Sequence, residues 1–293
     1  MGELKLSVII PTYNRCNDLD ECLKSLFKMK RVPDEVIIVD SCSTDSTYEL
    51  AKHFPVRYIR IGERSMVKAR NVGLKHATGD IVAYVDDDVV VSRDWSINLL
   101  EPYEDDKVVG VGGRVLPYGV HEDFYTLVRC CDVGRVLSNG MVFGNFDIPV
   151  STSIEVDTLI GCNMSFKREA LIKIGGFDEN FVGNCFRDET DVCIRLKRLR
   201  YRLVYNPKAI VWHKFRGKRF SYEWFYQTIR NHTYFYFKNF QPITPWKFIA
   251  FLLGTFFPPP DYMRKSSIEI KFNPILVVLA VRGFIDAWKT FHK

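Results

Sequence analysis

Three consecutive carboxylates, Asp86, Asp87 and Asp88, stand among the β-branched residues of a predicted strand. Adjacent like charges repel one another, and a buried carboxylate is costly unless it is paired or bound to a metal. Carboxylate oxygens are the ligands that Mg²⁺ and Mn²⁺ prefer, usually together with waters or substrate phosphates. The stretch therefore indicates either a divalent-cation site or a solvated acidic turn at a strand end.

A second group of acids, Asp188, Glu189 and Asp191, opens a predicted helix. Acidic side chains in a first turn compensate for the helix dipole, which accounts for one or two of the three. The functional alternative is a general base, a carboxylate that takes a proton from an attacking hydroxyl.

The composition describes a globular chain that must position these acids. Its 293 residues are 47% hydrophobic and 26% charged, enough for one large domain or two small ones, and the net charge of +6 is modest. The eight cysteines form no CxxC pair, which fits a reducing compartment and small buried side chains. Met1 leads directly into a strand, so no signal peptide is expected.

Apolar runs alternate with amphipathic segments in the first part of the chain. Strands are predicted at residues 6–10, 35–40, 56–61, 81–85 and 108–116, and helices after Asn17 as cap, after the turn at 41–47, and at 66–77 and 92–104. This order predicts an α/β fold with a mostly parallel sheet between helices. Ligands of such sheets bind beyond the carboxyl ends of the strands, where Thr12, Asp40 and the three aspartates would meet. That agreement favours a binding site over a solvated turn.

Four motifs in order give the chain a family resemblance. They are Val8 to Arg15 (VIIPTYNR), Ile38 to Asp45 (IVDSCSTD), Ala69 to Gly73 (ARNVG) and Tyr84 to Asp88 (YVDDD). Over roughly residues 5–215 the chain resembles an inverting family 2 glycosyltransferase with the GT-A fold. The resemblance implies a UDP- or GDP-linked sugar donor and a divalent cofactor, Mn²⁺ or Mg²⁺.

The resemblance also implies roles for individual residues. The residues expected to bind the donor are Pro11, Thr12, Tyr13, Arg15, Asp40, Ser43, Arg70, Asp86 and Asp87. Asp88 and His213 are expected to hold the metal, and Gly161 and Asn163 to border the sugar or acceptor. Three alternatives without a function in catalysis stay open. Arg70 could be a surface charge, His213 could have a structural role, and Gly161 and Asn163 could simply form a turn.

The catalytic motif departs from the family pattern. The family has Glu-Asp-x-Asp, whereas this chain has Asp188, Glu189, Thr190 and Asp191. The position of the base is therefore taken by Glu189, which is one methylene longer, and Asp188 remains a possible substitute.

Three parts of the chain are expected. The first, residues 1–115, would bind the nucleotide sugar, and it is followed by residues 116–219 and residues 220–293. The second part would carry the acceptor and catalytic residues. Its segment 118–153 is irregular, with one possible helix from Val120 to Arg135. From Arg195 to Arg219 the chain has ten basic residues and no acid. Nucleic-acid binding is disfavoured there, because the acidic rim would repel phosphates.

The last part is rich in aromatic and apolar residues. Residues 246–257 and a helix predicted at 274–291 are both too short to span a bilayer. They fit amphipathic helices lying in a membrane interface, with packing on the catalytic domain as the alternative. Gln227 to Asn231 resembles the Gln-x-x-Arg-Trp element of processive synthases, but Asn231 replaces the Trp, which favours addition of a single sugar.

The sequence therefore predicts a metal-dependent hexosyltransferase that moves one sugar to a hydroxyl or phosphate. The expected acceptor is lipid-linked, such as a polyprenyl phosphate, and the expected location is peripheral or monotopic at the cytosolic face of the cell membrane. The alternatives are a soluble glycosyltransferase for a protein or small-molecule acceptor, and a non-catalytic sugar-nucleotide-binding protein.

Overall fold

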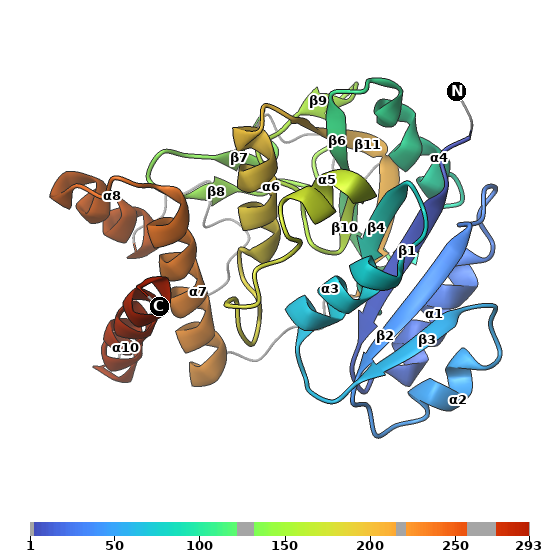
Figure 1. Cartoon of the computed structure of the whole chain (residues 1–293), viewed down its shortest axis with the longest axis horizontal. Helices are drawn as coiled ribbons and strands as arrows, with labels where there is room; N and C mark the ends of the chain where they lie inside the picture. The colour runs from blue at the N-terminus through green and yellow to red at the C-terminus, as the bar shows by residue number, and fades with distance from the viewer. Residues whose placement is uncertain (1–2, 122–131, 215–220, 257–273, 293) are drawn as a thin grey trace.

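The computed structural model describes residues 3–121, 132–214, 221–256 and 274–292 (Figure 1). The strands are β1 (Leu6–Thr12), β2 (Glu35–Ser41), β3 (Arg57–Ile61), β4 (Ile81–Val85), β5 (Val89–Val91), β6 (Val108–Pro117), β7 (Arg135–Val136), β8 (Val142–Phe143), β9 (Ile154–Glu155), β10 (Asn163–Lys167) and β11 (Arg202–His213). The helices are α1 (Cys16–Leu26), α2 (Thr47–Ala51), α3 (Met66–His76), α4 (Trp95–Leu100), the 3₁₀ turn η1 (Glu101–Glu104), α5 (Arg168–Lys173), α6 (Asp188–Arg198), α7 (Tyr222–Asn239), α8 (Pro245–Phe256) and α10 (Pro274–Phe291).

The central sheet has the strand order β3-β2-β1-β4-β10-β6-β11-β5, with β9 paired to β11. Strands β1, β2, β3, β4, β6 and β11 point the same way, whereas β5, β9 and β10 run against their neighbours. The predicted α/β fold with a mostly parallel sheet is therefore confirmed, and the sheet is continuous through both predicted halves of the catalytic domain.

Helices cover both faces of this sheet, so its inner strands are apolar on both sides. Along β1, Val8 and Ile10 pack with α1 and α4 in one core, while Ile9 between them packs with α3 and α6 in the other. This is the alternation expected of a strand whose successive side chains point to opposite faces.

Two predicted helices are corrected. Helix α1 begins at Cys16 and not after Asn17, because the carboxylate of Asp45 accepts the backbone N–H of Cys16 at 2.9 Å and satisfies the start of the helix from outside. Arg135 lies in β7 instead of ending a helix from Val120, and residues 132–134 are not helical. Residues 122–131 of that prediction lie outside the described residues.

The C-terminal helices gather beside α6, away from β1, β2 and β3 (Figure 1). Helix α7 packs on α6, and α10 lies along α7. The predicted final helix at 274–291 is confirmed as α10. No helix in the described part of the chain is long and apolar enough to cross a membrane.

Candidate active site

The three aspartates form the turn between β4 and β5, beyond the end of β1. Thr12, the last residue of β1, donates to Asp87 at 2.8 Å, and Arg15 donates to Asp87 at 3.0 Å and to Asp88 at 2.5 Å. Burial raises the pKa of Asp87 to about 7 in spite of this pairing. At Asp88 burial acts the same way, but the hydrogen bond with His213 and the charge of Arg15 outweigh it and lower the pKa.

His213 reaches the aspartates because β11 pairs antiparallel with β5. The register places His213 opposite Val89, next to Asp88, and its Nε2 lies 2.9 Å from Asp88 Oδ1. Asp86, Asp88 and His213 each offer a ligand atom, and these atoms lie within 4.8 Å of one another. Two carboxylates and one imidazole are a donor set that suits a divalent transition metal such as Mn²⁺. The residues present therefore fit the implied metal.

Arg70 joins the aspartates to the helix that carries the second group of acids. Its guanidinium lies 2.5 Å from Asp188 and 3.9 Å from Asp86, and it also contacts the carbonyl of Gly161 at 3.4 Å. Gly161 leaves room for this contact, since a Cβ there would lie 2.8 Å from the guanidinium. Arg70 is buried, so the alternative of a surface charge is wrong.

The three acids of α6 occupy different environments. Asp188 is buried, with one oxygen committed to Arg70 and the other accepting the backbone N–H of Glu189 at 2.7 Å. Asp191 is fully buried among the side chains of Arg195, Lys238 and Asn239. Glu189 is the most exposed of the three, and desolvation together with the charge of Asp188 raises its pKa well above the usual range.

Several of the residues expected to bind the donor lie at or just after the ends of β1 and β2. Asp40 is fully buried at the end of β2, where it accepts the backbone N–H of Ser43 at 2.8 Å and the hydroxyl of Tyr58. Ser43 in turn accepts the backbone N–H of Asn14 at 2.9 Å. Pro11 is buried inside β1, and the ring of Tyr13 lies under the guanidinium of Arg64, 4.5 Å from its centre.

Tyr58 and Arg60 were missed by the motif analysis. They are two residues apart on β3, so their side chains lie on the same face of the strand. Strand β3 pairs in parallel with β2, and Arg60 lies opposite Asp40. The guanidinium of Arg60 is 3.5 Å from the Asp40 carboxylate. A register argument between the two predicted strands could have found both residues, because side chains two apart on a strand share a face.

Asn163 stands apart from the other predicted site residues. It lies in β10 and is fully buried, and its backbone N–H donates to the carbonyl of Ile160 at 3.0 Å, which closes the turn at 160–163 that the sequence leaves open as the alternative. Its amide donates to the carbonyls of Arg114 and Ala209 and accepts from the indole of Trp95. These contacts are all within the sheet and its covering helix. The structure thus brings together the residues of β1, β4, β11, α3 and α6, and leaves Asn163 beneath them.

Comparisons with known proteins agree with this geometry. The sequence profile of Glycosyl transferase family 2 matches residues 7–175. A glucosyl-dolichyl phosphate glucuronosyltransferase from Haloferax volcanii is 30% identical over 241 residues, which are 75% of this chain and 72% of the relative. A pre-mycofactocin glycosyltransferase from Mycobacterium tuberculosis is 28% identical over 217 residues, 72% of this chain, but the match spans only 43% of that relative.

Solved structures show the same fold. The mannosyltransferase PcManGT from Pyrobaculum calidifontis, in complex with GDP-Man and Mn²⁺, has a TM-score of 0.62 at 20% identity, over 100% of this chain and 88% of the other. S. aureus TarS 1-349 in complex with UDP-GlcNAc has a TM-score of 0.61 at 20% identity, over 98% and 80%. The expected GT-A fold is confirmed. The profile match covers more than half of the chain, so the protein belongs to glycosyl transferase family 2 and is a glycosyltransferase.

Proposed function

We propose that the chain transfers one sugar, with inversion, from a nucleoside-diphosphate sugar to an acceptor hydroxyl or phosphate. The observation that carries the proposal is the meeting of two groups at one edge of the sheet. Asp86, Asp88 and His213 can hold a divalent cation, and Arg70 connects Asp86 to the helix turn of Asp188 and Glu189. One group suits a diphosphate and the other suits proton transfer.

The proposed metal site would help the nucleoside diphosphate to leave the donor sugar. A nucleoside diphosphate gains negative charge as it leaves, and a cation bound at Asp86, Asp88 and His213 would stabilise that charge as a Lewis acid. Arg15 keeps Asp87 and Asp88 paired, so the turn keeps its geometry before the donor binds. The same donor would lie along Thr12, Tyr13, Asp40 and Ser43, which follow the neighbouring strands.

Glu189 is the proposed general base. Asp188 is a poor candidate because its two oxygens are committed to Arg70 and to a backbone amide. Glu189 is more exposed, and its raised pKa makes it a stronger proton acceptor than an ordinary carboxylate. It would remove the acceptor proton as the acceptor oxygen attacks the anomeric carbon. Asp191, which is fully buried, takes no direct part.

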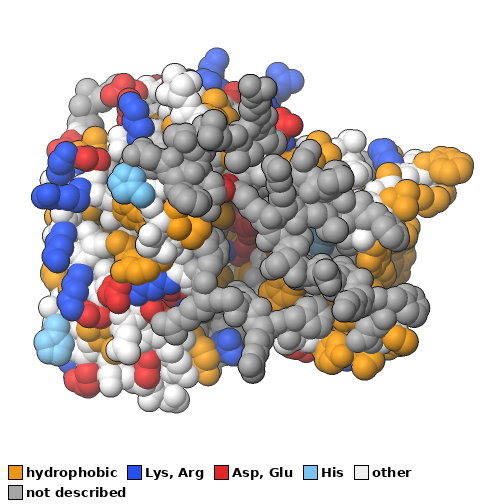
Figure 2. All heavy atoms as spheres, turned by 180° about the vertical axis from the view of Figure 1, so that it is seen from behind, with side chains coloured by type: hydrophobic (Ala, Val, Ile, Leu, Met, Phe, Trp, Pro, Cys, Tyr) orange, Lys and Arg blue, Asp and Glu red, His pale blue; other side chains and the backbone are white. Residues whose placement is uncertain are grey.

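We also place the acceptor on a lipid at a membrane surface. The haloarchaeal relative is named for a dolichyl phosphate substrate. Helices α8 and α10 expose nine large apolar side chains, which are Trp246, Ile249, Leu253, Ile275, Val277, Val278, Val281, Ile285 and Trp288. Figure 2 shows apolar side chains gathered over the end of the molecule that carries these helices. Lys247, Arg282 and Lys289 lie on the same two helices and suit anionic head groups.

The proposed organisation has three parts, and the proposed location follows from the third. Residues 1–115 would bind the donor, 116–219 would supply the base and acceptor contacts, and 220–293 would bring the site to the cytosolic face of a membrane.

Calorimetric titration with GDP-mannose and UDP-GlcNAc, with and without Mn²⁺, tests the donor and metal assignments. We expect at least one nucleotide sugar to bind only in the presence of Mn²⁺, and Asp88→Asn to weaken that binding at least about tenfold, since it removes a charged ligand. Asp106→Asn is the matched control, because this aspartate is exposed and remote from the metal group. Absence of any Mn²⁺-dependent binding would contradict the proposal.

A further inference from the structure

Helix α7 is attached to the catalytic helix α6 by buried polar contacts, in addition to apolar packing. Asp191 of α6 is fully buried, and it accepts hydrogen bonds from Lys238 at 2.9 Å and Asn239 at 2.9 Å, both at the end of α7. Arg195, one turn along α6, donates to the same carboxylate at 2.8 Å. A buried charge with this many partners is costly to disturb, because removal of one partner leaves the rest of the network unsatisfied.

The loop that leads into α6 is fastened to the same helix. Gln227 accepts the backbone N–H of Asn184 at 2.9 Å, and the Asn231 side chain exchanges hydrogen bonds with both backbone groups of Val182, at 2.8 and 3.3 Å. Asn231 is fully buried. It therefore holds the loop from 178 to 187 on α7, at a position where the processive synthases have Trp.

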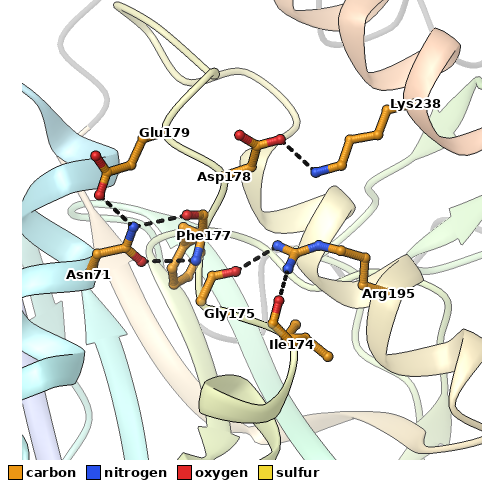
Figure 3. Close-up of a pocket in the computed structure, with 9 residues that line it drawn as sticks. Asn71, Ile174, Gly175, Phe177, Asp178, Glu179, Arg195 and Lys238 are labelled. Atoms are coloured by element: carbon orange, nitrogen blue, oxygen red, sulfur yellow. Dashed lines mark hydrogen bonds and ion pairs between the residues drawn. The ribbon is translucent and has the colours of Figure 1, made fainter. Parts of the chain in front are cut away.

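A third set of contacts connects the turn at 174–179 to α6 and to α3, the helix that carries Arg70. Figure 3 shows residues that line a pocket around the turn at 174–179. The volume of this pocket is about 530 Å³. Asn71, the neighbour of Arg70, exchanges hydrogen bonds with the backbone of Phe177 at 2.9 Å, and Arg195 donates to the carbonyls of Ile174 and Gly176. Asn71 and Arg195 therefore brace the backbone of this turn.

Lys238 is the point where these sets join. Its ammonium donates to Asp178 of the turn at 2.6 Å and to Asp191 of α6 at 2.9 Å. Burial opposes ionisation of Asp178, but the hydrogen bonds from Lys238, the Asn180 backbone and Tyr234, together with the charge of Lys238, lower the pKa of Asp178 to about 2. Tyr234, one turn earlier on α7, donates to the same Asp178 at 2.8 Å.

We propose that Lys238 and Asn239 are positioning residues for the sugar transfer. They hold Asp191 at the fourth residue of α6 while Arg70 holds Asp188 at the first, and Glu189 lies between the two attachments. Helix α7 is thus part of the catalytic apparatus and not only a connection to the apolar helices. The inference rests on the proposed role of Glu189 as the base.

Lys238→Met in the full chain tests this role, and Lys238→Arg is the conservative variant. The control is Lys28→Met, at an exposed lysine two residues after the end of α1. Two quantities are measured: hydrogen exchange of the backbone amides of residues 188–192, and release of nucleoside diphosphate from GDP-mannose and UDP-GlcNAc with polyprenyl phosphate in detergent micelles. We expect at least tenfold faster exchange in Lys238→Met. We also expect kcat to fall about 10- to 100-fold with donor KM within about twofold, because a displaced base costs rate and not donor binding.

Recovery of at least half of the lost kcat in Lys238→Arg, and wild-type values in Lys28→Met, would complete the support. Wild-type kcat in a folded Lys238→Met protein would overturn the proposal, even if exchange were faster. A wild-type protein that releases no nucleoside diphosphate would count against the proposed function, whereas unchanged exchange at 188–192 would count against the attachment itself. If Lys238→Met does not fold, Asn239→Leu, which leaves the charged pairs in place, is judged by the same criteria.

Discussion

Carboxylates that share one helical turn can serve three purposes. In α6, Asp188 anchors Arg70, Asp191 anchors α7, and Glu189 between them is left the more exposed group. The family resemblance places the base at Glu189 and keeps Asp188 as a possible substitute, but it does not indicate what Asp188 and Asp191 bind. Arg70 on α3 and Lys238 on α7 lie more than 40 residues away along the chain, and no local pattern encodes their contacts. Arg195, four residues after Asp191, is a local partner.

Glu189→Gln should lower turnover by about 10²–10⁴-fold while donor affinity stays within about twofold, because the amide cannot accept the proton. In the wild-type protein the base works only when it is ionised. Its raised pKa therefore places the acid limb of the kcat–pH profile above the value of an ordinary Glu, about 4.3. Glu169→Gln is the matched control, since Glu169 is an exposed acid in the first turn of α5. Near wild-type turnover in Glu189→Gln would remove Glu189 from the mechanism.

The same substitution should not destabilise the fold at alkaline pH. A carboxyl whose pKa is raised on folding contributes stability below its unfolded pKa, and this contribution is lost as the pH rises through the folded pKa. Gln carries no such loss, so at pH 8 the Glu189→Gln protein should melt at or above the wild-type temperature. The difference should shrink as the pH falls toward 4 in thermal denaturation. A clearly lower melting temperature at pH 8 would mean that Glu189 is a stabilising ion-pair partner.

At the scale of elements, strands β1, β2, β3, β4 and β6 were predictable because each is its own apolar or alternating run, whereas the short strands β7, β8 and β9 were not predicted. The register that makes the site was not. Strand β11 is irregular between Asn206 and Val211, and it resumes pairing with β6 and β5 so that His213 arrives beside Asp88. Bulges of this kind often occur next to active sites and re-aim a side chain. Asn163, predicted to border the substrate, instead donates to the Ala209 carbonyl inside the irregular stretch, at 2.9 Å.

Gly113→Ala tests whether this close approach of β6 and β11 is essential. A Cβ at Gly113 would lie 1.8 Å from the Ala209 carbonyl oxygen and 2.6 Å from the Asn163 amide, so the backbone must shift. We expect a loss of about 3 kcal/mol in the free energy of unfolding and weaker Mn²⁺-dependent donor binding. Gly62→Ala is the control, because a Cβ there meets nothing within 4 Å. Equal unfolding midpoints in denaturant for the Gly113→Ala and wild-type proteins would contradict the prediction.

At the scale of the molecule, the charges of the basic run are distributed differently from what the sequence indicates, whereas the apolar surface is where the sequence placed it. The run from Arg195 to Arg219 has ten basic residues and no acid in the sequence, yet Arg195, Lys197 and Arg202 all form ion pairs with acids elsewhere in the chain. Lys197 and Arg202 pair with acids of distant segments, which composition cannot reveal, whereas Arg195 pairs with Asp191, four residues earlier on the same helix. The apolar residues of 220–293 are not all covered, because many of them are exposed on α8 and α10.

The apolar face of α8 and α10 should bind a lipid surface, and vesicle sedimentation can measure it. Trp246 and Val278 are 79% and 65% exposed, so their burial in an interface would contribute roughly 1.5–3 kcal/mol each. The double substitution Trp246→Ser/Val278→Ser should therefore weaken binding to phosphatidylcholine vesicles, with or without phosphatidylglycerol, at least about tenfold.

The matched control is Ile97→Ser/Ile172→Ser, which removes two exposed apolar side chains from α4 and α5. Removal of the whole chain from Tyr222 onward would not test the surface, because it would also take away Lys238 and Asn239 and leave Asp191 without two of its partners. The point substitutions leave α7 in place, so release of nucleoside diphosphate in detergent should stay at the wild-type rate while vesicle binding falls. If vesicle binding is unchanged and light scattering shows a dimer that the double substitution dissociates, the face is an interface between two copies of the chain, and the acceptor is not presented by a membrane at this surface.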